Sequence, residues 1–456
     1  MRQFFIASLV AVVTSSIFAC EMVEPSDAAP KDTSGDASDT SSPDAGNVED
    51  ASDAADLPGV DVHGKLIDIL ARPVAGAKVV TGVTTTPVVT GADGTFTVKA
   101  SPPYDLVATT PSGDQVIVVV GLTRVDPIVS IPTSVSPRAY ATFSGAMPAI
   151  AAGQGARVIF EPTDGKSRFS DYAMSNGPTA AYERVPEWHA PGPFTGTMHL
   201  FQYTTGASNP AATFLGYSKV ENATADKDET TTIDFPALTP VQTGTISGVM
   251  TVPDGWSKGG SLFAFLRTAG SKARLTVNQS TSSDLSFSLP VPEMTDATYG
   301  IAFRASGTKS GEQSIVRKVV ALGETANVTM PASATVSAPA EGATNVDAET
   351  ELSWSKVDGV AHVMGDHTSG EPSATAPLFH IITAGASAKL PNLAPFGAAF
   401  ESGKTYAWRV VHYPLIATSD ALTAKGDVDW YCIAASPIGS DEAQCLFSEQ
   451  RTFVTK

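Results

Sequence analysis

The rhythm of the chain after residue 59, meaning its repeated alternation of apolar and polar residues between turns, is the feature that most restricts its fold. Short runs of alternating apolar and polar residues follow one another, separated by turn residues, and no long stretch shows the period of an amphipathic helix. The segment VVTGADGTFTVKA is typical, with Asp93 and Gly94 between two such runs. Glycine tolerates the positive φ that a tight hairpin turn requires. The rhythm therefore predicts an all-β fold, built from tandem β-sandwich modules.

A different kind of segment precedes this region. Arg2 supplies a positive charge before an apolar stretch, residues 4–13, that is too short to cross a bilayer as a helix, which takes about 20 residues. A charged start, an apolar middle and small residues before a cleavage site are typical of a secretory signal. We therefore expect residues 1–19 to be a signal peptide that is removed on export.

This segment ends in the residues Ile17-Phe18-Ala19-Cys20. The motif resembles the bacterial lipobox, and the resemblance implies that the thiol of Cys20 is lipidated and that Cys20 becomes the mature N-terminus. Lipid would then attach the protein to the membrane, and stable anchoring takes more than one acyl chain. The alternative is an ordinary signal peptide cut nearby, with Cys20 incidental.

Residues 20–58 are predicted to form a disordered acidic linker after this anchor. From Glu21 to Pro58 the chain holds eleven acidic residues and one base, Lys31, which gives the stretch −10 of the chain's net charge of −18. So polar a segment buries too little apolar surface to offset its ordering entropy. We expect a solvated tether that reaches about 35 Å on average. A specific acidic binding tail is the alternative.

The charge and the cysteines of the remaining chain limit its function further. Its mild acidity argues against nucleic acid as a partner, because phosphates require basic grooves. Beyond Cys20 the chain has two cysteines, Cys432 and Cys445. An even pair in an exported chain predicts a disulfide, worth roughly 3 kcal/mol for a loop of about 14 residues.

The first module, residues 59–135, carries a recognisable set of turn and strand residues. They are Val62, Gly64, Pro73, Gly76-Ala77-Lys78-Val79, Thr90, Asp93-Gly94 and Phe96. This pattern resembles the carboxypeptidase regulatory-like (transthyretin-like) domain. The resemblance implies a small β-sandwich without catalytic residues, which serves as a spacer, folding aid or binding module.

The second module, residues 136–241, and the third module, residues 242–333, look related to each other. FSGAMP, from Phe143, aligns with ISGVMT, from Ile246, and the two modules end in TIDFP and NVTMP. The first module ends in the same style, with IVSIP. Proline after a terminal strand is consistent with the end of a module, because its nitrogen cannot donate a hydrogen bond to a continuing β-ladder. The pattern predicts a repeat; a chance alignment between β-rich segments is the alternative.

The fourth module, residues 334–456, contains ELSW, KTYAWRVVHY and RTFVT. These segments resemble a fibronectin type III-like domain. The resemblance implies that Trp354 packs in the core and that the hydroxyl of Tyr406 bonds to backbone. The module departs from that family by an insertion between Val411 and Phe447, which we interpret as a stapled hairpin or loop.

One stretch of the second module is rich in aromatic residues. Tyr182, Trp188, His189 and Phe194 lie on or beside a Pro-rich segment that we expect to be a loop, and they form a possible binding patch. Exposed aromatic rings stack on sugars or anchor protein partners. The alternative is that Trp188 and Phe194 turn inward and close the core.

Two other polar clusters contain residues of the kinds that bind metal ions. The first holds three histidines with an aspartate, and the second is an acidic turn, but neither has the order of ligands that a known site requires. We expect solvent-exposed histidines, a solvated turn, and no metal or cofactor. The sequence also lacks the G-x-S-x-G and H-E-x-x-H patterns of hydrolases. The two clusters are His362, Asp366, His367 and His380, and Asp226, Asp228 and Glu229.

Together these features predict an exported lipoprotein, membrane-anchored through Cys20, at the outer membrane and facing the periplasm or the cell surface. The expected role is non-catalytic: a scaffold, an adhesin, or a module that binds a polysaccharide or a protein partner. Two alternatives stay open, an accessory component of a secreted hydrolase system and a purely structural stalk. The sequence leaves the oligomeric state unknown.

Overall fold

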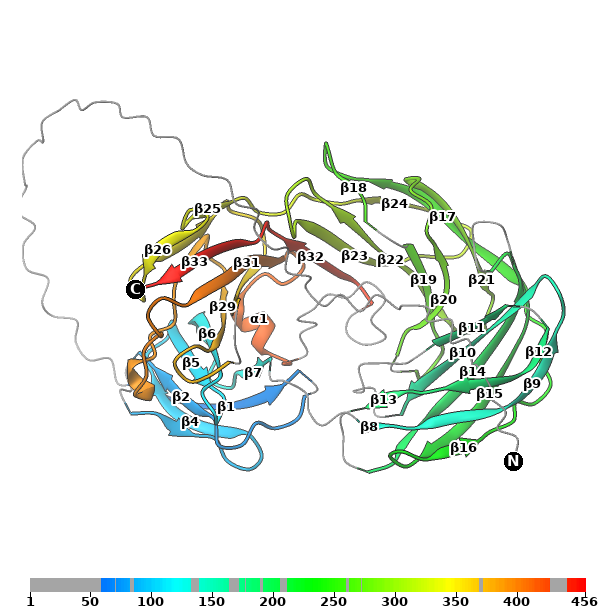
Figure 1. Ribbon diagram of the computed structural model, residues 1–456, viewed down its shortest axis with the longest axis horizontal. Coiled ribbons are helices and arrows are strands. Elements are labelled where there is room, and N and C mark those ends of the chain that lie inside the picture. The colour runs from blue at the N-terminus through cyan, green and yellow to red at the C-terminus, as the bar shows by residue number, and fades with distance from the viewer. Residues whose placement is uncertain are drawn as a thin grey trace, which may run out of the picture. The chain divides into compact units, whose positions relative to one another are not determined.

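The computed structural model confirms the all-β prediction (Figure 1). It describes residues 59–69, 71–82, 86–132, 139–163, 172–176, 178–188, 192–205, 211–259, 262–271, 273–368, 372–426 and 441–456, which all belong to one unit of the chain. Within these ranges the α-helical structure amounts to one five-residue helix. The predicted signal peptide, Cys20 and the acidic linker lie outside the described residues.

The first three modules consist of strands joined by short turns. Those of the first module are β1 (Val60–Asp68), β2 (Lys78–Thr81), β3 (Val88–Val89), β4 (Thr95–Ala100), β5 (Tyr104–Thr109), β6 (Gln115–Leu122) and β7 (Ile128–Ile131). Those of the second are β8 (Ala139–Tyr140), β9 (Thr142–Ile150), β10 (Gln154–Pro162), β11 (Tyr172–Asn176), β12 (Thr179–Arg184), β13 (Glu187–Trp188), β14 (Phe194–Thr204), β15 (Thr213–Ala225) and β16 (Thr230–Thr232). Those of the third are β17 (Thr243–Thr251), β18 (Ser257–Lys258), β19 (Leu262–Arg267), β20 (Leu275–Ser280), β21 (Ser286–Pro292), β22 (Thr298–Ser306), β23 (Gln313–Val319) and β24 (Thr325–Thr329).

The fourth module adds two short helical elements to its strands. Its elements are β25 (Val336–Ala338), β26 (Ala343–Val346), β27 (Glu351–Trp354), β28 (Val360–His367), β29 (Leu378–Thr383), β30 (Ser387–Lys389), η1 (Ala394–Phe396), β31 (Thr405–Tyr413), α1 (Ser419–Thr423), β32 (Ala443–Phe447) and β33 (Arg451–Thr455).

Each of the first three modules contains a three-stranded sheet of the same topology. The sheets run β4-β1-β7, β12-β9-β16 and β21-β17-β24. In each, the central strand pairs antiparallel with one neighbour and parallel with the last strand of the module. The two segments aligned in the sequence from Phe143 and Ile246 are the equivalent central strands β9 and β17. The repeat in the sequence thus corresponds to a repeated sheet, which the first module shares.

A glycine in each central strand lies opposite an aromatic residue of the antiparallel neighbour. A Cβ atom at Gly64 would lie 2.1 Å from Cζ of Phe96, and one at Gly248 would lie 1.9 Å from the backbone oxygen of Ala326. Only glycine therefore fits, and the aromatic ring covers the backbone that it leaves bare. The three cross-strand pairs are Gly64–Phe96, Gly145–Tyr182 and Gly248–Phe287.

A fifteen-stranded sheet joins three of the four modules. Its main path is β20-β19-β22-β23-β32-β31-β28-β29-β6-β5-β2-β3, so strands of the third, fourth and first modules follow one another (Figure 1). β6 pairs parallel with β29 of the fourth module, and β32 pairs antiparallel with β23 of the third. The order of the modules along this sheet therefore differs from their order along the chain.

Strand β6 belongs to two hydrophobic cores at once. Ile117 and Val119 pack in the core of the first module, whereas Val116 and Val118 pack in that of the fourth. All four side chains are buried. A strand that is covered on both faces needs a continuous apolar run, and the sequence VIVVV supplies it. The first and fourth modules are therefore packed together through a shared strand.

The described part of the predicted insertion in the fourth module contacts the first and third modules. Its helix α1 docks on the first module, where the carboxylate of Asp420 accepts a hydrogen bond from the backbone N–H of Thr123 at 2.9 Å. Leu422 enters the core of the first module. Cys445, in β32, is buried and disulfide-bonded. Cys432, its predicted partner, lies outside the described residues, so this pairing stays a prediction.

The second and third modules share a hydrophobic core as well. Phe201 and Tyr203 of β14 pack with Ile246 and Leu262 of the third module. At the same junction the guanidinium of Arg157 donates to the backbone oxygen of Thr276 at 2.8 Å. Apolar cores are close-packed, so relative movement of two modules across such a junction disrupts many contacts.

Candidate functional site

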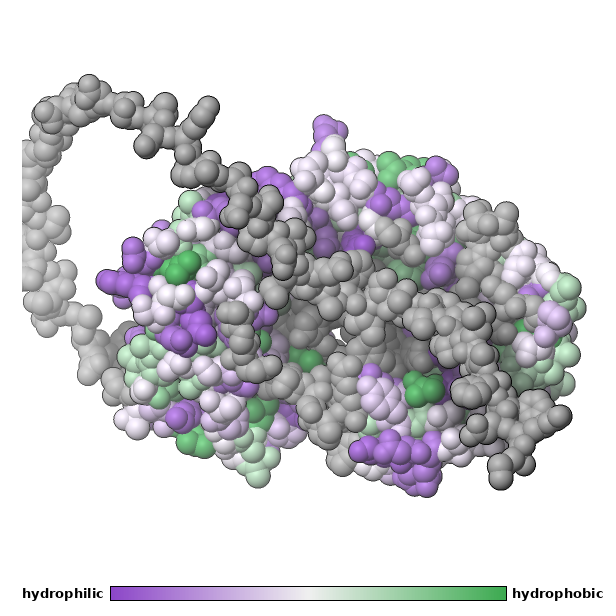
Figure 2. Space-filling model, in the orientation of Figure 1, coloured by the Kyte–Doolittle hydropathy of each residue, from purple (hydrophilic) through white to green (hydrophobic). Residues whose placement is uncertain are grey.

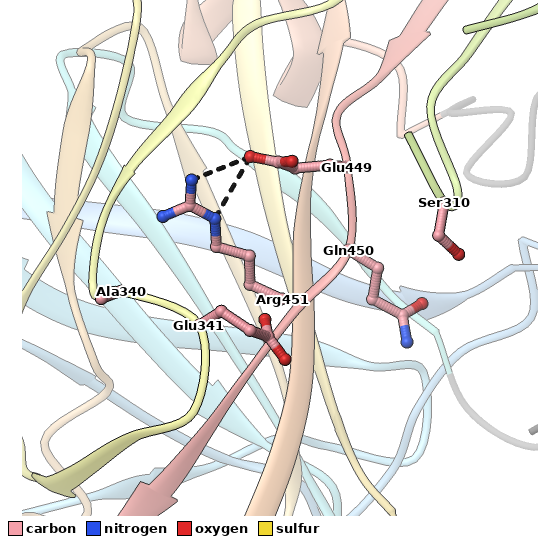
Figure 3. Close-up of a pocket in the computed structure, with 6 residues that line it drawn as sticks. All are labelled: Ser310, Ala340, Glu341, Glu449, Gln450 and Arg451. Atoms are coloured by element: carbon pink, nitrogen blue, oxygen red, sulfur yellow. Dashed lines mark hydrogen bonds and ion pairs between the residues drawn. The ribbon is translucent and has the colours of Figure 1, made fainter. Parts of the chain in front are cut away.

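A pocket of about 450 Å³ lies where the third and fourth modules meet (Figure 3). It is open to solvent, and its polar side chains make it the first candidate for a ligand site. The lining residues are Ser310, Ala340, Glu341, Glu449, Gln450 and Arg451.

The charged side chains of this pocket are engaged with one another and with backbone. Arg451 donates to Oε1 of Glu449 at 2.9 Å and to the backbone oxygen of Val336 at 2.8 Å. Glu449 also pairs with Lys309 at 3.0 Å. Burial opposes ionisation of Glu449, but the hydrogen bonds from Lys309 and Arg451 outweigh it and lower the pKa of this carboxyl. Glu341 accepts a hydrogen bond from the backbone N–H of a β33 residue at 2.9 Å. These groups join the start of the fourth module to its last strand, β33, and suit a structural contact better than a ligand site.

Three residues of the possible aromatic patch are buried, so they offer no surface to a ligand. Tyr182, Trp188 and Phe194 expose 8%, 1% and 3% of their area. The rings of Trp188 and Phe194 stack with centroids 4.9 Å apart, and the indole N–H donates to the backbone oxygen of Gly192 at 3.3 Å. The inward-packing alternative describes these side chains. His189 lies outside the described residues.

Tyr182 has a structural task that explains its burial. It lies over Gly145 in the repeated glycine–aromatic pair, and its hydroxyl donates to the backbone oxygen of Ile233 at 2.6 Å. Ile233 follows β16, so this bond ties the two edges of the sheet across its central strand. Burial raises the pKa of the phenol, which stays neutral at physiological pH.

The expectation of solvent-exposed histidines in the fourth module is wrong. His362, His367 and His380 are all buried, because they lie on β28 and β29 in the interior of the long sheet. Nε2 of His362 lies 3.0 Å from Nδ1 of His380. Burial lowers the pKa of His380 to about 3 and that of His362 well below its usual value. Asp366 is exposed, and no metal-binding group of three His, Cys, Asp or Glu residues is found within the described ranges.

The acidic residues Asp226, Asp228 and Glu229 form an exposed turn between β15 and β16. Asp228 has a φ of 63°, and the backbone N–H of Glu229 bonds to the backbone oxygen of Asp226 at 3.2 Å. The arrangement is that of a solvated turn.

A hydrogen-bonded chain that the sequence did not reveal contains a serine, a glutamate and a histidine. Oγ of Ser271 donates to Oε1 of Glu161 at 2.5 Å, and Nε2 of His199 lies 3.0 Å from Oε2 of the same glutamate. Nδ1 of His199 lies 2.9 Å from the hydroxyl of Tyr217. A nucleophilic serine needs a base that takes its proton, and here it contacts the carboxylate instead of the imidazole. The network links the second module to a turn of the third.

The fourth module places its aromatic residues largely as the sequence indicates. Trp354 and Trp408 are buried in its core. The hydroxyl of Tyr406 donates to the backbone oxygen of Pro377 at 3.1 Å. The expected bond to backbone is present, although its acceptor lies 29 residues upstream.

Large exposed apolar residues are scattered over the described surface. They include Val89, Val249 and Leu415, which lie in different modules. The face in Figure 2 shows small separate apolar areas among pale and hydrophilic residues. Such a surface gives no sign of a broad apolar docking site. In the described part of the chain, no helix is long and apolar enough to span a membrane.

Comparisons with known proteins place the chain in no family. No family model matches it, and no curated protein matches its sequence. Among solved structures it is similar to the Bacillus anthracis TIE protein, with 10% identity, 60% of this chain and 49% of that chain covered, and a TM-score of 0.15. A streptococcal ancillary pilin matches with 10% identity, coverage of 60% and 99%, and a TM-score of 0.14. A C-terminal fragment of the pilus adhesin SpaC from Lactobacillus rhamnosus GG matches with 14% identity, coverage of 43% and 96%, and a TM-score of 0.12.

These matches are a distant resemblance to bacterial surface proteins, and the chain spans about half the length of the TIE protein. TM-scores this low carry no argument about function.

Proposed function

We propose that this protein is a non-catalytic lipoprotein of the bacterial cell envelope, which holds a rigid scaffold of four β modules at the membrane on an acidic tether. The observation that carries the proposal is the sharing of β6. Alternate residues of this strand fill the cores of the first and fourth modules, so the two modules cannot separate without exposing Val116 and Val118. Modules joined in this way favour one rigid arrangement over a flexible array of independently moving modules.

The burial and hydrogen bonding of the polar clusters support a scaffold over an enzyme. An active site needs convergent groups that a substrate can reach. The His362–His380 pair is buried in the fourth module, and the Ser271–Glu161–His199 chain connects two modules with its serine directed to the carboxylate. Each cluster has a structural explanation in packing or in module contacts.

The membrane anchor is tested with Cys20→Ser in the natural host. Wild-type protein should incorporate radiolabelled palmitate and sediment with membranes. The Cys20→Ser variant should lose the label and no longer sediment with them. Ser16→Ala changes the same segment but keeps the cysteine, so it should behave as wild type. A Cys20→Ser protein that retains both the label and the membrane attachment would contradict the proposed anchor.

The side of the membrane is tested with protease on intact cells. A scaffold displayed on the surface should be cleaved from whole cells, whereas one facing the periplasm should be cleaved only after the outer membrane is permeabilised. Protection in both samples would contradict an envelope location outside the cytoplasm.

A further inference from the structure

The outer face of the sheet β21-β17-β24 consists mainly of small hydroxyl and amide side chains, with Val249 among them and Pro290 at one end. Strand β17 presents Thr245, Ser247, Val249 and Thr251 to this side, while the alternate residues point into the core. The neighbouring strands add Ser286, Ser288, Thr325, Asn327 and Thr329. We call these nine residues the hydroxyl face.

The members of the hydroxyl face are in register. Ser247 lies opposite Ser288 on one side and opposite Thr325 on the other, and Val249 is likewise flanked by residues of both neighbours. Outward residues repeat about every 6.8 Å along a strand, and strands lie about 4.8 Å apart. The face is therefore a regular grid of hydrogen-bonding groups that surrounds one valine.

These hydroxyl groups are available to a ligand. Ser288 and Thr325 are exposed and Ser247 is half-buried. Within the described part of the chain, none of the three side chains bonds to another protein group. A serine or threonine hydroxyl both donates and accepts hydrogen bonds, so each can pair with a ligand hydroxyl that acts as acceptor or as donor.

The fold does not require this face to be neutral, as the first module demonstrates. There the equivalent sheet presents Asp61, His63 and Lys99 outward, and Lys99 pairs with Asp61 at 3.0 Å. In the third module the charged residues Asp284 and Glu324 lie before the strands, outside the grid. Lys318 reaches the edge, where its ammonium donates to the backbone oxygen of Asn327 at 3.5 Å.

The chemistry of the face selects among partners. A polyanion needs a set of cationic side chains, and the nine residues supply none. The chain's net charge of −18, of which −10 lies in the predicted acidic linker, also opposes binding of such a polymer. A protein partner is usually held by Trp, Tyr or Arg at the centre of the interface, and here the centre is Val249. A neutral polymer rich in hydroxyl groups satisfies the grid without burying a charge.

We propose that the hydroxyl face binds a neutral polysaccharide. Individual hydroxyl contacts are weak, so affinity comes from many contacts along a polymer, and short oligosaccharides should bind far less tightly. The inference adds a ligand class to the proposed scaffold and rests on its display in the envelope, but the binding itself can be measured on purified protein.

The test is affinity electrophoresis of the full-length protein, purified in detergent, through gels that contain dextran, pullulan or laminarin as neutral polymers, or alginate as a polyanion. We expect retardation by at least one neutral polymer and none by alginate. The double variant Ser288→Lys/Thr325→Lys should raise the apparent Kd at least tenfold. Thr97→Lys puts the same charge at the position of β4 that corresponds to Ser288, and it should leave binding unchanged.

Melting curves establish that each variant is folded. Absence of retardation by every neutral polymer would overturn the proposal, as would equal binding by the double variant and Thr97→Lys. Retardation by alginate alone would also overturn it and would point to charge-driven binding elsewhere. None of these results depends on Cys20 or on location, so a failure here is distinguishable from a failure of the proposed envelope function.

Discussion

Acid should unfold this protein because it buries neutral histidines. His380 and His412 expose 5% and 1% of their area, and burial lowers their pKa values to about 3 and about 4. The pKa of His362, which burial and the neighbouring His380 both affect, is also lowered well below its usual value. In the unfolded chain each imidazole is free to ionise near pH 6.5. As the pH falls below that value, protons bind the unfolded state first, and the free energy of unfolding falls with them.

The size of the effect follows from the pKa values of His380 and His412. At pH 5 an unfolded histidine is almost fully protonated, whereas His380 and His412 in the folded protein stay mostly neutral. Each of them therefore lowers the free energy of unfolding by about 2 kcal/mol relative to pH 8, or about 4 kcal/mol for both. Domains are stable by about 5–15 kcal/mol, so the loss is a large fraction of the total.

The assay is urea unfolding at half-unit steps between pH 8 and pH 5, a range that limits contributions from carboxyl groups. Removing one titrating group with His412→Gln should reduce the steepest slope by about 1.4 kcal/mol per pH unit. Ile381→Val, a core change that keeps every histidine, should lower stability by about 0.5–1.5 kcal/mol at all pH values alike. A stability that does not change between pH 8 and pH 5 would refute the reasoning. An unchanged slope in His412→Gln would refute the role of that residue.

Two further predictions concern the joints of the fold. Ile117→Ala should lower the free energy of unfolding by about 2–5 kcal/mol and raise amide hydrogen exchange in β29 of the fourth module as well as in the first module. The control Val89→Ala, at an exposed edge position, should have little effect. Faster exchange confined to the first module would contradict a shared strand. Gly248→Ala should destabilise the protein by about 1–3 kcal/mol or more, because its Cβ meets the backbone oxygen of Ala326, while Gly82→Ala, in open space, should not; equal melting temperatures of the two variants would count against the close approach.

The elements that the sequence predicted well are those with a local signal. The alternation in TFTVKA and RTFVT appears as β4 and β33, with the expected alternate burial in β4. The aligned FSG and ISG segments are equivalent central strands, and the close approach of Ala326 gives the physical reason for the glycine at position 248. Tyr182 could have been recognised as structural from the same signal, because it faces Gly145 as Phe96 faces Gly64.

The buried histidines could not be placed from the sequence. His362 and His380 lie on the strands VAHVMGDH and LFHIIT, which do not alternate and are buried along most of their length. A lone polar residue in such a run gives no local sign of what covers it. Their burial depends on segments that are distant in the sequence. Ile117 of β6 lies in register with His380, and Leu422 of the insertion packs in the same core as Ile382. That cover comes from segments whose position no local pattern specifies.

Strand β6 shows most clearly that a local sequence pattern does not identify a packing partner that is distant in the chain. Its run QVIVVVGL loses the alternation of a half-buried strand, and a continuous apolar run is the signature of a strand covered on both faces. The sequence thus contains evidence that a second layer exists, but it does not identify the layer. The partner is β29, and Gln115 pairs with Leu378, so the contact spans most of the folded chain. Pairings this distant in sequence form late, because loop-closure entropy must be overcome first. The first module, although made earliest, therefore depends on the fourth module to cover Val116 and Val118. The module boundaries that the sequence indicates are boundaries of repeats, and they need not be boundaries of independent folding.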